Sequence, residues 1–135
     1  MRELVVAIAQ LDRVLGDKEA NVEKALRYIA EAANKGAEVV CLPEYFNTGF
    51  GYKDIAKMRE ELGKQAEPIP GPTIQTLQQA CKASHVGVIG SMVEVAQGNP
   101  HNTGFAIDPS GRLINTYRKV HLFQVESQVP KFPPI

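Results

Sequence analysis

The sequence predicts an α/β domain that begins with a βαβ unit and continues with a helix and antiparallel strands. Apolar runs rich in β-branched residues occupy positions 4–10 and 39–42, and the segment between them has helical periodicity. Short joins between strand, helix and strand are typical of parallel strands with a right-handed crossover. Further along, the turn sequence DPSG separates the apolar runs 99–107 and 113–117, which indicates an antiparallel hairpin.

The composition is that of one ordinary globular domain. At 135 residues the chain is long enough for a hydrophobic core and too short for two domains. Its 15 basic and 15 acidic residues balance, so the charge does not favour a nucleic acid or an anionic membrane as a partner. The apolar run 4–9 is too short to span a bilayer. We therefore expect a cytoplasmic protein in which Cys41 and Cys81 are free thiols.

The first half of the chain carries the βαβ unit. Residues 4–10 form the first expected strand, and their nearly continuous apolarity predicts a central position in the sheet rather than an edge. Asp17 is a suitable N-cap for a helix that runs to about Asn34, and Gly36 suits its C-terminal end. The second strand begins at Glu38. The apolar positions of the helix have the spacing of one buried face: Val22, Ala25, Leu26, Ile29 and Ala33.

The second half is expected to add helices and the antiparallel strands. The charge-rich segment 53–64 predicts a short surface helix. The connector EPIPGP then leads to Pro72, and proline is favoured at the first position of a helix. The inner face of that helix is marked by Ile74, Leu77 and Cys81. Strands are expected at 86–92, 99–107 and 113–117.

Glu44 is the first candidate for chemistry. It follows the second strand directly after Pro43, at the carboxyl end where open α/β sheets place their ligands. Aromatic neighbours such as Tyr45 and Phe46 are expected to support the site and to desolvate the carboxylate, which suits a general base. The alternative, equally weighted on chemistry alone, is a loop glutamate that caps a turn or pairs with a surface lysine.

Lys119 is the second candidate, in the segment YRKVHLF just past the last hairpin strand. A lysine held in a dry site can stabilise an oxyanion as it develops. The alternative is a solvated lysine at a strand end, which is the more common situation of a single lysine. His121 lies two residues further and is expected on the same side of an extended chain, either supporting the site or serving a structural role.

Other kinds of site find little support. Cys41 lies inside an apolar strand and Cys81 on the core face of a helix, so packing is expected of both rather than nucleophilic attack. Walker, GxGxxG and GxSxG motifs are absent from the sequence. His85, His101 and His121 are too scattered to indicate zinc. We therefore expect no cofactor and no metal.

A series of motifs between Val5 and Phe123 resembles the N-terminal half of the nitrilase (carbon–nitrogen hydrolase) superfamily. The motifs, in order, are VAIAQ, VVCLPEYFNTGF, PGPT, VIGS, HNTGFAIDPSGRL and YRKVHLF. The resemblance implies a partial α-β-β-α sandwich. It also implies that residues 1–123 are the N-terminal part of a carbon–nitrogen hydrolase domain. Residues 124–135 are then an irregular, proline-containing tail at which the domain is cut short.

The resemblance further implies a Glu-Lys-Cys triad that hydrolyses non-peptide carbon–nitrogen bonds of small molecules, with an amide expected ahead of a nitrile. By motif, Glu44 is the general base, Lys119 stabilises the oxyanion, and His121 matches the histidine of the lysine motif. Glu126 matches a second family glutamate in a looser pattern. The family nucleophile lies downstream of the lysine motif, so neither Cys41 nor Cys81 is at its position and the chain is expected to lack a nucleophile.

Three explanations of the missing cysteine stay open at this stage, in descending order. The chain is a truncated product or a fragment of a longer protein, one half of a split enzyme, or a catalytically silent module that binds a partner or ligand. The partners expected from the resemblance are a complementary C-terminal half or a second copy of the chain, because members of the family usually form oligomers.

Overall fold

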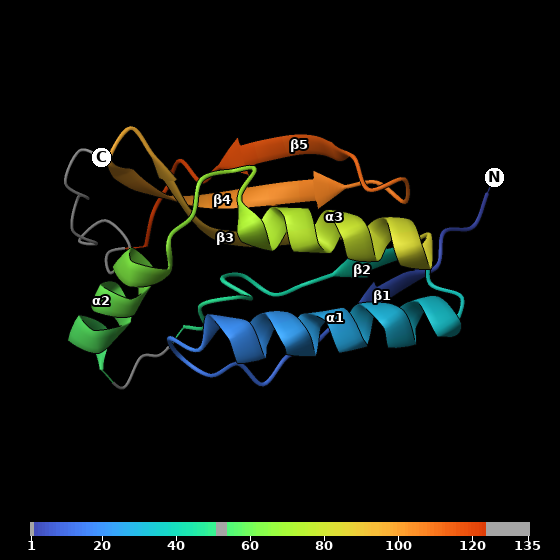
Figure 1. Cartoon of the computed structure of the whole chain (residues 1–135), viewed down its shortest axis with the longest axis horizontal. Coiled ribbons are helices and arrows are strands. Elements are labelled where there is room, and N and C mark those ends of the chain that lie inside the picture. Colours follow the sequence, from blue (N-terminus) through green and yellow to red (C-terminus); the bar gives the residue numbers. More distant parts are fainter. Residues whose placement is uncertain (1, 51–53, 124–135) are drawn as a thin grey trace.

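A computed structural model describes residues 2–50 and 54–123 of the protein, arranged as one mixed sheet with helices on one side (Figure 1). The five strands lie in the order β1-β2-β3-β4-β5, which is also their order along the chain. The predicted α/β class is therefore confirmed. The elements are β1 (Val6–Ile8), α1 (Lys18–Asn34), β2 (Val39–Cys41), α2 (Ile55–Gln65), α3 (Pro72–Ser84), β3 (Gly87–Ala96), β4 (Asn99–Ile107) and β5 (Leu113–Arg118).

The predicted βαβ unit is present. The Asp17 side chain caps α1 by accepting a hydrogen bond of 3.1 Å from the Ala20 amide. Gly36 follows the helix with a φ of +84°, a left-handed conformation that costs glycine little. β1 and β2 are parallel, with Val6 opposite Val39. This part of the sequence analysis is correct to within a few residues.

The expected central position of the first strand is wrong. β1 lies at one edge of the described sheet and pairs with β2 alone. Its apolar character has a different cause. Continuous apolarity shows that both faces of a strand are apolar, but it does not show how many strands lie beside it. Ile8 is 80% exposed on the face of the sheet that no helix among the described residues covers.

The main core lies between the sheet and the two helices α1 and α3, which run side by side over the same face (Figure 1). Pro72 is the first residue of α3, as predicted, and the inner face of that helix is fully buried. Gly90 of β3 leaves room for the Phe105 ring, which a side chain at that position would meet at 2.9 Å. The core includes Ala25, Ile29, Val40, Ile74, Leu77, Cys81, Val88, Phe105 and Ile107.

The antiparallel part also agrees with the prediction, although β3 is longer than expected. β3 extends to Ala96, beyond the expected end at 92, and pairs with β4 over its length.

The helix α2 lies near the end of the sheet, apart from α1 and α3 (Figure 1). It is less of a surface element than expected, because Met58 and Leu62 are fully buried in a second cluster with Tyr45 and Val93.

The face of the sheet opposite α1 and α3, here called the open face, is apolar and exposed. Ile8, Cys41 and Ile89 stand in one row across three strands, and Tyr117 extends this face onto β5. Residues 124–135, including Glu126 and the predicted boundary of the tail, lie outside the described residues. No helix in the described ranges is long and apolar enough to cross a membrane.

Candidate active site

Glu44 lies in a tight loop that continues from the carboxyl end of β2, where the sequence placed it. The next residue, Tyr45, has a φ of +52°, and this left-handed conformation reverses the chain direction. Ser91 of β3 holds the turn: its hydroxyl accepts a hydrogen bond of 3.2 Å from the Tyr45 amide, and its carbonyl accepts one of 3.3 Å from the Phe46 amide. The Glu44 backbone is therefore fixed to the centre of the sheet.

The aromatic residues of the loop do not desolvate the Glu44 carboxylate, contrary to the expectation. Tyr45 and Phe46 are buried, and Tyr45 stacks on Phe50 with ring centroids 5.7 Å apart. The Glu44 side chain itself is 54% exposed. The turn at Tyr45 explains the difference, because it directs the aromatic rings into the core and leaves the carboxylate outside. The aromatic side chains therefore anchor the loop in the core and do not exclude water from the carboxylate.

Lys119 meets Glu44 across the sheet. Its ammonium nitrogen Nζ lies 3.0 Å from Glu44 Oε1, although the two residues are 75 positions apart in the chain. Lys119 follows the last residue of β5, and its amide donates a hydrogen bond of 2.8 Å to the Asn102 carbonyl. Side-chain alternation places Lys119 on the same side as Tyr117, so the pair borders the open face. The structure thus brings the first two candidates into one site.

Asn102 is a member of this site that the sequence analysis missed. It lies on β4, is buried, and its Nδ2 donates a hydrogen bond of 2.6 Å to Glu44 Oε1. Its backbone carbonyl is the acceptor for the Lys119 amide. One residue therefore fixes both the carboxylate and the backbone of the lysine. The available signal was a polar amide inside an expected strand, where a buried polar group needs a hydrogen-bond partner.

Of the two remaining candidates, His121 lies within the described residues and Glu126 does not. His121 is exposed, and no hydrogen bond or ion pair joins it to Glu44 or Lys119 among the described residues. The role expected of Glu126 therefore stays a prediction. Among residues 2–50 and 54–123, no group of three or more His, Cys, Asp or Glu side chains could hold a metal ion.

The cysteines are free, and they differ in surroundings. Cys81 is fully buried on α3, as predicted, and burial raises the pKa of its thiol to about 11. It is therefore a neutral thiol at physiological pH and a poor nucleophile. Cys41 is half-buried in β2, and within the described residues no hydrogen bond connects it to Glu44 or Lys119.

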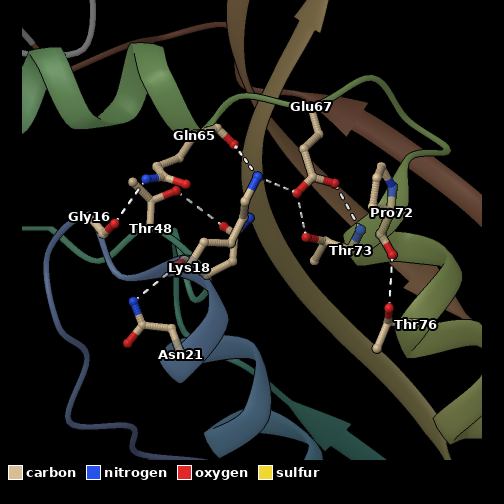
Figure 2. A network of polar contacts seen from close by, with 10 residues as sticks. Gly16, Lys18, Asn21, Thr48, Gln65, Glu67, Pro72, Thr73 and Thr76 are labelled. Atoms are coloured by element: carbon tan, nitrogen blue, oxygen red, sulfur yellow. Dashed lines mark hydrogen bonds and ion pairs between the residues drawn. The ribbon is translucent and has the colours of Figure 1, made fainter.

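Another glutamate, Glu67, shows what a structural carboxylate looks like in this fold (Figure 2). Lys18 Nζ lies 2.7 Å from Oε1, while Thr73 donates from its hydroxyl at 2.6 Å and from its amide at 2.8 Å. Burial alone raises the pKa of Glu67, but the hydrogen bonds from Lys18 and Thr73 outweigh it and the net pKa is lowered. The network ties the start of α1 to the start of α3.

The carbon–nitrogen hydrolase family profile matches residues 5–133 of this chain. The omega-amidase NIT2 of Homo sapiens is 36% identical over 127 residues, a match that covers 93% of this chain and 43% of that protein. Nitrilase homolog 2 of Dictyostelium discoideum is 31% identical over 129 residues, covering 93% of this chain and 37% of that protein. The chain therefore spans less than half the length of these curated relatives.

Solved structures share the fold. A crystal structure of an amidase from Nesterenkonia sp. matches with a TM-score of 0.73 at 19% identity, covering 97% of this chain and 48% of that one. A crystal structure of an N-terminal amidase matches with a TM-score of 0.75 at 19% identity, covering 92% and 29% respectively. At this level of identity the matches show a common nitrilase-type architecture.

Proposed function

The chain belongs to the carbon–nitrogen hydrolase family, and from this premise we propose that it hydrolyses non-peptide carbon–nitrogen bonds of small amides. It does so through a Glu-Lys-Cys triad to which it contributes Glu44 and Lys119. The observation that carries the proposal is the 3.0 Å contact between these two side chains, which are 75 positions apart in the chain. The nucleophilic cysteine comes from outside residues 1–135.

In the proposed reaction, Glu44 accepts the proton of the cysteine thiol, and the thiolate attacks the carbonyl carbon of the amide. The carbonyl oxygen becomes negatively charged and is stabilised by the Lys119 ammonium. Protonated Glu44 then gives its proton to the leaving nitrogen. The carbon–nitrogen bond breaks, ammonia departs, and a thioester remains. Water, deprotonated by Glu44, attacks the thioester, and the acid product leaves while the sulfur regains a proton.

Asn102 has a supporting part in this proposal. Its amide holds Glu44 Oε1 at 2.6 Å, and its carbonyl holds the Lys119 amide. Proton transfer needs the donor and the acceptor within hydrogen-bond distance, so a general base works only when it is correctly positioned. Asn102 is thus a positioning residue that keeps the base and the oxyanion stabiliser in register.

An amide is favoured over a nitrile as the substrate because relatives and structural neighbours carry amidase names. The open face supports the proposed partner. Exposed apolar surface of this kind marks a protein contact, so a complementary C-terminal half or a second copy covers it in the working enzyme. The nucleophile then arrives with the complementary half.

A non-enzymatic binding module is the second candidate. The observation that favours it is that neither Cys41 nor Cys81 joins the Glu44–Lys119 pair. Without a thiolate the covalent route is closed, and the pair alone supplies little amidase activity. Such a module would use the open face to bind a partner without turnover.

Reconstitution separates the two candidates. The chain is mixed with, and separately fused to, the part of human omega-amidase NIT2 that follows its matched region, and ammonia release from propionamide is measured. We expect ammonia from the wild-type combination and none from either component alone. A stable complex without ammonia would support the binding module. Absence of ammonia from both the mixture and the fusion would overturn the proposed hydrolase.

A further inference from the structure

A half-buried ion pair lies directly beside Lys119. Arg118 donates two hydrogen bonds to Glu94, from Nε to Oε2 and from Nη2 to Oε1, each 2.8 Å long. The Thr103 hydroxyl donates a third bond of 2.7 Å to Oε2. Glu94 is buried, whereas about half of the Arg118 side chain is exposed. We call these three residues the clamp.

The clamp connects three neighbouring strands. Glu94 lies on β3, Thr103 on β4 and Arg118 at the end of β5, and the register pairs Thr103 with Arg118. In the described sheet β5 is an edge strand that pairs with β4 alone. The end of an edge strand has fewer backbone neighbours than a central strand, so its position depends on side-chain contacts. The clamp supplies such contacts at the residue before Lys119.

Because side chains alternate along an extended chain, the position of Arg118 determines the side toward which Lys119 points. Consecutive residues of an extended chain point to opposite sides, so fixing Arg118 on one side directs Lys119 to the other. On that other side lie Asn102 and the Glu44 carboxylate. A guanidinium–carboxylate fork with two parallel bonds fixes both distance and orientation. An apolar contact of the same size fixes neither.

We propose that the Glu94–Arg118–Thr103 clamp is the positioning device that holds Lys119 within hydrogen-bond distance of Glu44. Glu94 and Arg118 are then positioning residues for the reaction, acting through Lys119. The inference rests on the proposed function for the reaction that Lys119 serves, and the geometry it asserts is measurable in this chain by itself.

The test follows the ammonium group of Lys119 by ¹H–¹⁵N spectroscopy of the full chain, using its rate of proton exchange with water. Glu94→Gln removes the charge from the clamp, and Arg118 can then turn toward water. Glu94→Met/Arg118→Met replaces the whole pair by apolar side chains, a change that buried ion pairs often tolerate. Arg112→Ala is the matched control, because it breaks the pair of Arg112 with Asp108 just before β5 begins.

We expect both clamp variants to accelerate exchange of the Lys119 ammonium protons roughly fivefold, the order of the net contribution of one hydrogen bond. The Arg112→Ala control should leave the rate unchanged. Unchanged exchange in either folded clamp variant would overturn the proposal. Loss of folding in both clamp variants would also overturn it, because the clamp would then hold the whole sheet together rather than set the lysine.

The reconstituted enzyme provides an independent measure. There Glu94→Gln should lower kcat roughly tenfold, the order expected for a misplaced catalytic group, and leave KM unchanged. A rise in KM with unchanged kcat would contradict a positioning role. If the wild-type reconstituted enzyme releases no ammonia, the proposed function fails, while the ammonium exchange rates still decide whether the clamp places Lys119.

Discussion

Glu67 and Glu94 differ from Glu44 in the exposure of their side chains, although all three form an ion pair with a basic side chain. The Glu67 and Glu94 side chains are 6% and 9% exposed, and each carboxylate accepts three or more bonds from its ion-pair and hydroxyl or amide partners. Glu44 is 54% exposed, and its partner Lys119 is 36% exposed. The difference teaches that the buried carboxylates act by holding neighbouring elements in place, while Glu44 is held by its neighbours yet stays accessible to a reacting group.

The largest effect should come from the accessible pair. Glu44→Gln or Lys119→Ala should lower ammonia release by the reconstituted enzyme roughly 10³-fold, because each removes a group that acts only in the reaction. The urea midpoint of the chain should hardly change, since exposed pairs contribute little to stability. Parallel kinetic and denaturation measurements check both parts. A variant that keeps its activity would remove that residue from the mechanism.

The Glu67 network should show the opposite behaviour. Lys18→Met leaves a buried carboxylate without its charge partner and should lower the free energy of unfolding by about 3 kcal/mol. Glu67→Gln should cost about 2 kcal/mol, because Lys18 can still reach water. Urea denaturation measures both. Lys35→Met breaks the exposed pair with Glu31 and serves as the control, with no change in midpoint. Equal urea midpoints for Lys18→Met and Lys35→Met would contradict the claim that the buried pair stabilises the fold and the exposed pair does not.

Acid should weaken the fold through the buried carboxylates. The hydrogen bonds from Arg118 lower the pKa of Glu94. Burial raises the pKa of Glu67, but the hydrogen bonds from Lys18 and Thr73 outweigh burial, and the net pKa is lowered. A lowered pKa means that the folded state binds fewer protons than the unfolded state. This stabilisation is therefore complete above the unfolded value of 4.5 and is lost as the pH falls through the folded pKa.

Urea midpoints between about pH 6 and about pH 3 check the sign. The wild-type midpoint should fall with pH, and the fall should be smaller in Glu67→Gln. Asp108, whose pKa is held at about 2 chiefly by the Ser110 hydroxyl, contributes equally to both chains. An identical pH dependence in the two chains would assign the acid sensitivity to other groups.

The smallest effect is expected from the cysteines. Cys41→Ser should change ammonia release by the reconstituted enzyme less than about twofold, because the proposed nucleophile is supplied by the companion chain. Cys81 should resist alkylation at neutral pH, since burial both shields the thiol and raises its pKa to about 11. Mass spectrometry after iodoacetamide treatment measures the second point. A large loss of activity in Cys41→Ser would place the nucleophile in this chain.

Local structure was predictable because its signals are local. The N-cap at Asp17, the proline at the start of α3 and the turn after β4 each depend on a few neighbouring residues, and the structure has all of them. The edge position of β1 was missed because strand order depends on pairing partners far along the chain. A strand that is apolar on both faces has the same pattern at an edge and in the centre.

The candidate site divides in the same way. The chemistry of Glu44 and Lys119 alone left solvated alternatives open, and it was the motif resemblance that selected them; the structure then placed them 3.0 Å apart. Asn102 and the Glu94–Arg118 pair were missed, because their roles come from contacts between strands. Glu67 was hidden in a proline-rich connector that resembles exposed loop. Buried polar networks need the fold before they can be recognised.

The most direct test of the account asks where the substrate's acyl group becomes attached. The wild-type chain and its companion are mixed with propionamide, quenched in acid during turnover, and weighed by intact-mass spectrometry. We predict a propionyl adduct on the companion polypeptide, none on this chain, and loss of the adduct with Glu44→Gln. A propionyl adduct on Cys41 or Cys81, or one that forms equally well with Glu44→Gln, would contradict the account.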